Sequence, residues 1–203
     1  MSSGSSARSG GLDDEAGRRI LLQSIVELTR SLFGARACSI MSYDPGSREL
    51  IFEAVAGEGA DTLVGRRISA RTGLAGWALA SEEPIAVSDV RHDPRFAREV
   101  AEETGYVPTA ITVYPLLHDE GSLGVLNVLD QSASERVGLA DMEALGRIAT
   151  HTAAVLALVQ GARGAEPGQD EFTRLRARLS AARPGQRAAA ADALDALRRL
   201  LES

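Results

Sequence analysis

Residues 108–130, "PTAITVYPLLHDEGSLGVLNVLD", decide the fold of this chain. Two runs rich in aliphatic and β-branched residues, 108–117 and 121–130, flank the polar turn "HDEG". Runs of this length, separated by a few polar residues that include glycine, are typical of a β-hairpin. The stretch therefore predicts two neighbouring antiparallel strands.

A second hairpin is predicted upstream, where the strand-like runs 35–44 and 48–57 flank the turn "PGS". Residues 18–34 and 139–160 enclose the two hairpins and carry apolar residues at helical spacing. In the first helix the expected apolar stripe consists of Leu21, Ile25, Leu28 and Leu32, widened by Leu22 and Val26. In the last helix it consists of Leu145, Ile148, Thr152, Leu156 and Val159.

The segment between the hairpins predicts shorter elements. A short helix is expected at 72–83, a strand opened by proline at 84–90, and another short helix at 93–106. Asp93 is the expected N-cap of that last helix, and Pro94 its first helical residue.

The order of these elements indicates the fold class. Helices and strands are mixed, but hairpins dominate, which favours an α+β fold with an antiparallel sheet over a parallel βαβ array. The first and last helices are expected together on one face of the sheet. The middle helices and loops then cover the other face.

The chain is expected to divide into four parts. Residues 1–17 predict a flexible, disordered Ser/Gly tail, and 18–160 form the globular domain. Residues 161–170 are a Gly/Pro/Ala linker. Residues 171–203 carry two apolar stripes broken by "RPGQ", which predicts a helical hairpin extension. So short a hairpin cannot hold a core alone, so it packs on the domain, on a second copy or on a partner.

Composition excludes several classes of protein. The 203 residues are 44% apolar and 25% charged, and no apolar run reaches the roughly 20 residues that a bilayer needs, so no membrane association is expected. A net charge of −6 argues against nucleic-acid binding. The only cysteine, Cys38, cannot form an internal disulfide, which fits a reducing cytoplasm. All 22 basic residues are arginine, a bias expected of a GC-rich bacterial genome.

Two stretches together resemble GAF domains. "RTGLAGWALASEEPIAVSDVRHDPRF", residues 71–96, is similar to the central segment of that family, and 108–130 is similar to its closing hairpin. The resemblance covers about residues 18–160. It implies a six-stranded antiparallel sheet between helices, with a small-ligand pocket on one sheet face. It also implies dimerisation through the terminal helices and a role as a sensory input.

The resemblance also implies where a ligand would lie. Trp77, Phe96, Ile111, Val113 and Asn127 are the candidate lining residues, chosen by their place in the fold. For Trp77 two interpretations stay open, because a tryptophan beside Gly73 and Gly76 either fills a core or walls a hollow. The pairing of residues 111 and 113 on one face depends on strand register, since a slip of one residue exchanges the faces.

The ligand and any cofactor stay unknown, although some chemistries are disfavoured. Members that reduce free methionine sulfoxide need several cysteines and bilin-binding members need one in the pocket wall, whereas Cys38 is alone and apparently in a strand. Haem needs an axial histidine, and none of His92, His118 and His151 is clearly placed in the pocket. Cyclic-nucleotide-binding members often carry a lysine next to an asparagine such as Asn127, and this chain has no lysine. Arginine could still bind a phosphate.

Two functions remain open. No catalytic arrangement is apparent, so an enzyme is not expected. The first function is a non-catalytic sensory module that binds a small molecule and acts as a homodimer or through a separate output protein. The second is a dimerising scaffold whose pocket is closed by its own side chains.

Overall fold

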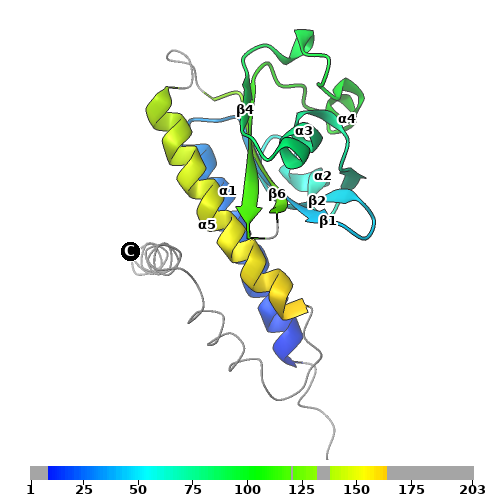
Figure 1. The fold of residues 1–203 in the computed structure, drawn as a ribbon, viewed down its shortest axis with the longest axis vertical. Coiled ribbons are helices and arrows are strands. Elements are labelled where there is room, and N and C mark those ends of the chain that lie inside the picture. The colour runs from blue at the N-terminus through cyan, green and yellow to red at the C-terminus, as the bar shows by residue number, and fades with distance from the viewer. Residues whose placement is uncertain (1–8, 120, 132–137, 164–203) are drawn as a thin grey trace, which may run out of the picture.

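The computed structural model describes residues 9–119, 121–131 and 138–163, arranged as a six-stranded sheet with helices on both faces (Figure 1). The elements in chain order are α1 (Ser9–Leu32), β1 (Ala37–Asp44), β2 (Glu49–Gly57), α2 (Ala60–Leu63), β3 (Arg67–Ser69), α3 (Gly73–Ser81), β4 (Ile85–Val87), η1 (Val90–His92), α4 (Arg98–Glu103), β5 (Ile111–His118), β6 (Gly121–Leu129) and α5 (Leu139–Arg163).

Both predicted hairpins form, and they meet in the middle of the sheet. The strand order is β3-β2-β1-β6-β5-β4, and every neighbouring pair is antiparallel. β1 pairs with β6 so that Ser39 lies opposite Asn127 and Ile40 opposite Leu126. The prediction of an α+β fold with a six-stranded antiparallel sheet is confirmed.

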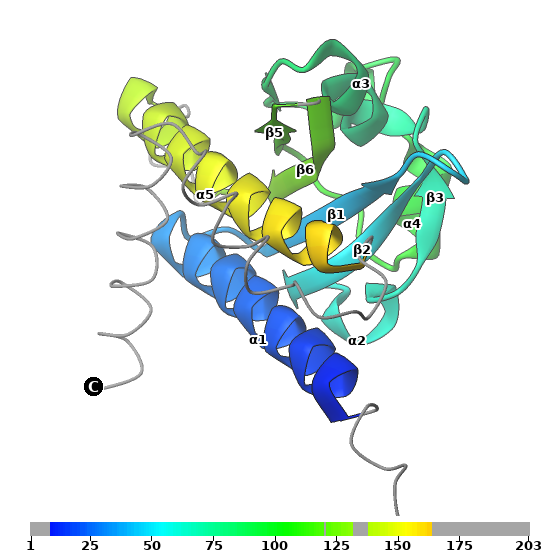
Figure 2. The same ribbon diagram turned by 60° about the horizontal axis from the view of Figure 1, so that its bottom comes forward.

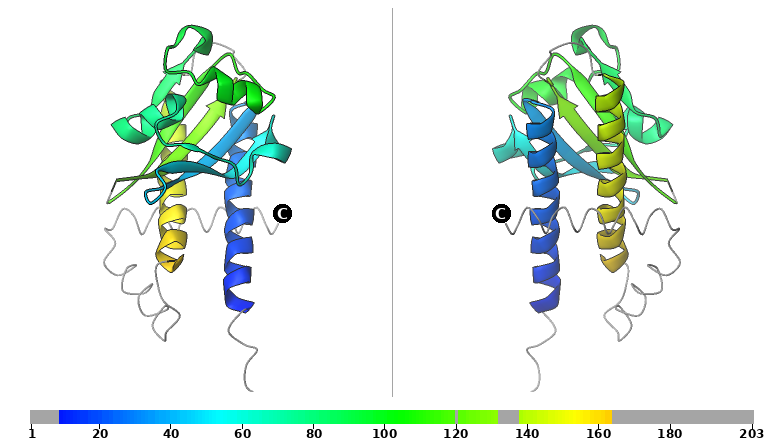
Figure 3. Two further views of the ribbon diagram at one scale, coloured as in Figure 1. Left: turned by 90° about the vertical axis from the view of Figure 1, so that its right-hand side faces the viewer. Right: turned by 90° about the vertical axis from the view of Figure 1, so that its left-hand side faces the viewer.

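The first and last helices, α1 and α5, lie side by side on one face of the sheet (Figures 2 and 3). They enclose the helix-side cluster, a set of buried apolar residues from α1, β1, β2, β5, β6 and α5. The largest members include Leu22, Ile40, Leu116, Leu126, Leu145 and Leu156, each 1% exposed or less. This face is therefore sealed by two long helices.

Only part of the apolar stripe predicted for the first helix packs on the sheet, namely Leu22, Val26 and Ile25. Leu22, Val26 and Thr29 are buried, whereas Leu28 is 45% and Leu32 65% exposed. Apolar residues cover more than one stripe of this helix, so periodicity alone could not choose the face. The helix also begins at Ser9, ahead of the predicted start at residue 18.

Polar contacts fix α1 against β2. Arg18 pairs with Glu53 at 2.9 Å, and both side chains are about one-tenth exposed. Gln23 donates a hydrogen bond to the carbonyl of Val55 at 3.0 Å. These contacts hold α1 against β2 in the orientation that leaves Leu28 and Leu32 exposed.

The opposite face of the sheet is covered by the short helices α2, α3 and α4 and the loops between them (Figure 1). They enclose the short-element cluster, whose buried members include Met41, Leu50, Leu74, Val90, Val113 and Val125. Gly76 shows why α3 needs a small residue, because a Cβ there would lie 2.7 Å from the carbonyl oxygen of Ala70. Gly73, with φ +68°, adopts the left-handed conformation that glycine tolerates best.

The prediction for residues 93–106 was wrong at its start. The helix α4 begins only at Arg98, and Asp93 does not cap it. The Asp93 carboxylate instead accepts hydrogen bonds from the backbone N–H of Arg95 at 2.9 Å and from its guanidinium at 2.7 Å. These bonds hold residues 93–95 in a turn that precedes the helix.

The chain's C-terminal predictions lie mostly outside the described residues. α5 continues through Arg163, so residues 161–163, predicted as linker, are helical. The rest of that linker and the helical hairpin at 171–203 lie outside the described part of the chain.

Candidate functional site

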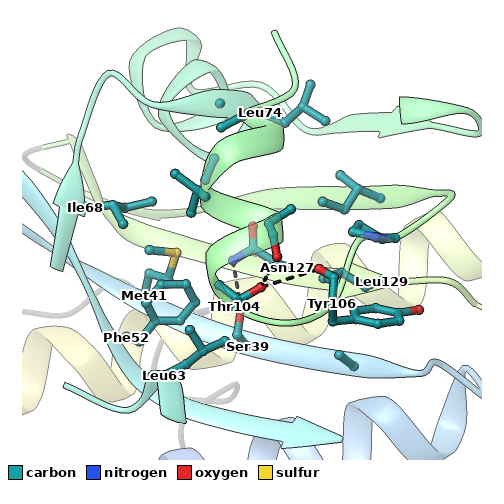
Figure 4. Close-up of a pocket in the computed structure, with 18 of the residues that line it drawn as sticks. Ser39, Met41, Phe52, Leu63, Ile68, Leu74, Thr104, Tyr106, Asn127 and Leu129 are labelled. Atoms are coloured by element: carbon teal, nitrogen blue, oxygen red, sulfur yellow. Dashed lines mark hydrogen bonds between the residues drawn. The ribbon is translucent and has the colours of Figure 1, made fainter. Parts of the chain in front are cut away.

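A cavity of about 130 Å³ lies between the sheet and its cover of short elements (Figure 4). Each of the elements around it contributes to the apolar part of its wall. The larger apolar side chains are Met41 from β1, Phe52 from β2, Leu63 from α2, Ile68 from β3, Phe96 and Ile111. An apolar cavity of about 150 Å³ in another protein holds a benzene molecule, so this space suits a ligand of about that size.

Two buried polar side chains, Asn127 and Ser39, interrupt the apolar wall. They lie opposite each other on β6 and β1, and each residue is 6% exposed. The Asn127 Nδ2 donates a hydrogen bond to Ser39 Oγ at 3.1 Å. The Asn127 Oδ1 accepts no hydrogen bond from the described residues, so this acceptor is available at the cavity wall.

Thr104, at the end of α4, is the third polar side chain near the centre of this view (Figure 4). Its hydroxyl already bonds the carbonyls of Ala101 at 2.7 Å and Tyr106 at 3.4 Å. Its one hydroxyl proton is therefore used by the backbone, which leaves the oxygen only as an acceptor. The Asn127 Oδ1 is likewise an acceptor that no donor of the described residues reaches.

A polar network closes the rim of the cavity beside Tyr106. The Tyr106 hydroxyl donates to the Asp130 carboxylate, whose Oδ1 also accepts from the backbone N–H groups of Thr109 and Ala110 at 2.8 and 2.7 Å. Burial and the bond to Asp130 raise the pKa of Tyr106, so the phenol stays protonated. The Arg36 guanidinium lies 5.3 Å from the centre of the Tyr106 ring and bonds Glu58 at 3.0 Å.

The wall of the cavity carries no cationic side chain. Of the lining residues that the structure describes, none is arginine, lysine or histidine. Glu58 is the one lining carboxylate, and it is 47% exposed and already paired with Arg36. The cavity therefore offers no partner for a buried anion.

The structure brings together three of the five residues proposed from the sequence. Phe96, Ile111 and Asn127 line the cavity, with Ile111 and Asn127 on adjacent strands. Val113 is fully buried in the same short-element cluster but lies outside the lining. Trp77 packs against that cluster, also outside the lining, with the Arg95 guanidinium 5.1 Å from the centre of its ring.

Sequence reasoning missed Ser39, Met41, Phe52, Thr104 and Tyr106. Ser39 meets Asn127 only through the β1–β6 pairing, which joins residues 88 positions apart. No local pattern carries that information. The alternation of β1 predicts that Ser39 and Met41 share one face, which would have placed both at the cavity once the face was known.

Cys38 lies on the other side of β1, in the helix-side cluster. Burial raises the pKa of its thiol to about 12, and the side chain is fully buried. Only its backbone can face the cavity. A thiol so placed remains protonated and is a poor nucleophile.

The three histidines also lie away from the cavity wall. His92 is exposed and contacts Asp89 at 3.1 Å, and His118 is exposed near the end of β5. His151 lies in α5, where its Nδ1 is buried and has no partner among the described residues. Among the residues that the structure describes, no group of three or more His, Cys, Asp or Glu side chains could hold a metal ion. No helix of the described residues has the length and apolar character that a membrane span requires.

Comparison with known proteins gives one family. The model of the GAF domain family matches residues 18–156, well over half of the chain. Among curated protein sequences, none matches this chain significantly.

Solved structures share the fold at low sequence identity. The GAF domain of a phosphoenolpyruvate-protein phosphotransferase from Coxiella burnetii is 22% identical with a TM-score of 0.66, covering 79% of this chain and all of that one. The GAF-B domain of DevS from Mycobacterium smegmatis is 17% identical with a TM-score of 0.56, covering 72% and 97%. A type II free methionine-R-sulfoxide reductase from Thermoplasma acidophilum is 18% identical with a TM-score of 0.56, covering 71% and 95%. Similarity at this level concerns the fold alone.

Proposed function

This chain belongs to the GAF domain family, and from that premise we propose that it is a non-catalytic sensory module. Its cavity binds a small molecule, and the bound state is read out at the surface of α1 and α5. The readout is self-association or the docking of a separate output protein. The observation that carries the proposal is the cavity itself, about 130 Å³ of space on one face of a sheet whose other face is filled.

Protein interiors are normally packed to the density of organic crystals. A hollow lined by apolar side chains costs stability because its lining lacks contacts that a filled core would provide. A ligand that fills the hollow restores those contacts and stabilises the folded state according to its concentration and affinity. The cavity therefore supports a binding function better than a structural one.

β1 and β6 connect the cavity to the helices. Ser39 and Asn127 line the cavity, while their chain neighbours Ile40 and Leu126 are buried in the helix-side cluster. A ligand that shifts these two strands necessarily shifts side chains that touch α1 and α5. This gives a direct physical route from the bound molecule to the helix surface.

The outer surface of the helix pair offers apolar area for association. Ile20 and Leu32 of α1 are about two-thirds exposed, and Leu28 of α1 and Leu158 of α5 are nearly half exposed. Leu21, Ile25, Leu28 and Leu32 recur at intervals of four, three and four, the spacing of a coiled-coil seam. We propose that this stripe mediates a homodimer.

A non-catalytic role is supported by the chemistry of the lining. The aliphatic hydroxyls among the lining residues belong to Ser39, Thr72 and Thr104, and none of them bonds a carboxylate or a histidine in the described residues. The Cys38 side chain faces the helices and its thiol stays protonated. Binding without a covalent step fits these groups.

The proposal is tested by a thermal-shift panel of neutral, anionic and cationic small molecules on the full chain, with light scattering on every compound that raises the melting temperature. We expect at least one class to raise it and to change the dimer fraction. A panel without any stabilising compound, together with a constant dimer mass, would contradict the sensory proposal and favour the ligand-free scaffold.

The dimer surface is tested with Leu28→Glu combined with Leu32→Glu. Two buried charges would oppose association, so we expect a monomer by light scattering. Leu117→Glu is the matched control, because Leu117 is 47% exposed but lies in β5, away from α1. A dimer that persists in the double variant would place the interface elsewhere.

A further inference from the structure

We propose that the cavity selects a neutral ligand with one aromatic ring and one hydrogen-bonding group, and that Asn127 reads that group. This inference rests on the proposed function and names the ligand class for the same cavity. Four features of the cavity carry it: its size, its charge, its free polar atom and its aromatic wall.

Size limits the ligand to a single ring. The free space is about 130 Å³, comparable with the roughly 150 Å³ cavity that holds benzene in another protein. A nucleotide, a bilin or a haem is several times larger than one ring. Only part of such a molecule would fit into this space.

Charge limits the ligand to a neutral molecule. An anion moved from water into an apolar site is strongly disfavoured unless a cation pairs with it. The lining residues that the structure describes include no arginine, lysine or histidine. The Glu58 carboxylate at the rim is engaged by Arg36, so a cationic ligand would compete with an existing ion pair.

Asn127 requires one hydrogen-bonding group on the ligand. Its Nδ2 is bonded to Ser39, and its Oδ1 has no donor among the described residues although the residue is 6% exposed. This acceptor is accessible from the cavity and has no protein donor, so a ligand O–H or N–H that reaches it gains a hydrogen bond. A phenol hydroxyl donates and accepts, so it bonds the Asn127 amide in either orientation of its two ends.

Aromatic and sulfur-containing side chains favour a ring over an aliphatic group. Phe52, Phe96 and Met41 all line the cavity. Aromatic pairs gain energy beyond the area that they bury, and methionine sulfur makes favourable contacts with ring edges. The ligand class is therefore a small phenol or a molecule of the same shape and polarity.

The test measures affinities of four probes for the full chain by titration calorimetry: p-cresol, toluene, 4-methylcyclohexanol and benzoate. We expect p-cresol to bind about tenfold more tightly than toluene, which lacks the hydroxyl, because one net hydrogen bond corresponds to about that factor. It should also bind more tightly than the saturated alcohol. Benzoate should show no binding.

The variant Asn127→Leu tests whether this residue causes the preference for p-cresol over toluene. We expect it to lower the affinity for p-cresol about tenfold and to leave toluene unchanged or improved. Thr152→Val is the matched control, because Thr152 is a fully buried polar residue of α5 on the other side of the sheet. That substitution should change neither affinity.

The comparison of probes on the unmodified chain stands even where a variant fails to fold. Equal affinities for p-cresol and toluene, or measurable binding of benzoate, would overturn the ligand class while leaving a binding function in place. If no probe binds but another compound of the wider panel stabilises the chain, this inference fails and the sensory proposal stands. If no compound of any class binds, both fail.

Discussion

The two faces of the sheet are made by the same strands but are covered in different ways. On one face two helices of 24 and 25 residues, α1 and α5, enclose a filled cluster. On the other face the cover consists of helices of four to nine residues, and a cavity of about 130 Å³ remains beneath them. Long helices present a continuous side-chain surface to a sheet, whereas short pieces joined by loops do not. The hollow is a consequence of that difference.

β6 shows the contrast within neighbouring residues. Leu126 and Val128 point into the helix-side cluster, and Asn127 between them lines the cavity. The strand alternation that builds a core on one side delivers a polar side chain to the other. Truncating a side chain on the helix-covered face should therefore cost more free energy of unfolding than truncating one on the cavity face.

The largest difference is expected between Leu126→Ala and Ile111→Ala. Leu126 is fully buried in the filled cluster, so its truncation should cost about 2–5 kcal/mol in the free energy of unfolding. Ile111 is half-buried and borders free space, so its truncation removes fewer contacts and should cost clearly less. Urea unfolding of the two variants measures both values. Equal costs would show that the two faces are packed alike.

Trp77→Ala separates packing from binding on the covered face. Trp77 is half-buried against the short-element cluster and lies outside the lining, so we expect a loss of about 2–3 kcal/mol, near the lower end for a large aromatic. Ligand affinity should not change. Phe96→Ala is the counterpart, because Phe96 lines the cavity and its loss should weaken binding. A large change of affinity in Trp77→Ala would extend the site to that side chain.

The smallest effect on stability at neutral pH is expected from Cys38, whose thiol lies in the helix-side cluster. The pKa of the folded thiol is about 12, against about 8.5 for a free cysteine. The folded chain should therefore resist alkylation by iodoacetamide at pH 8, while the urea-unfolded chain reacts at the ordinary rate. The unfolded thiol ionises first, so this group lowers stability only as the pH rises from about 8.5 toward 12. Rapid alkylation of the folded chain at pH 8 would place the thiol at the cavity.

Much of the fold could be predicted from the sequence because hairpins carry local signals. The runs at 35–57 and 108–130 predicted four strands with their turns, and these four strands form the centre of the sheet. The order of the elements predicted the placement of the terminal helices, and the family resemblance implied the six strands. The face of α1 was predicted only in part, because the predicted stripe held Leu22 and Val26 together with Leu28 and Leu32, and only the tertiary contacts decide which of them pack on the sheet.

The site was less accessible to sequence reasoning. Phe96, Ile111 and Asn127 were found from their place in the fold that the family resemblance implies. Trp77 was expected either to fill a core or to wall a hollow, and it packs at the margin of the cluster beneath Arg95. Ser39 depends on a register between strands far apart in sequence, which composition and periodicity do not encode.

The central claim, that one face is filled and the other hollow, is tested most directly by adding volume to each. Ala149 of α5 is 3% exposed in the helix-side cluster, and Ala75 of α3 lines the cavity. Both are helical alanines, so Ala149→Leu and Ala75→Leu add the same atoms to the same backbone conformation. The account predicts that Ala149→Leu loses about 1–3 kcal/mol in urea unfolding through overpacking, while Ala75→Leu keeps the stability of the parent chain. A loss in Ala75→Leu as large as that in Ala149→Leu would contradict the account.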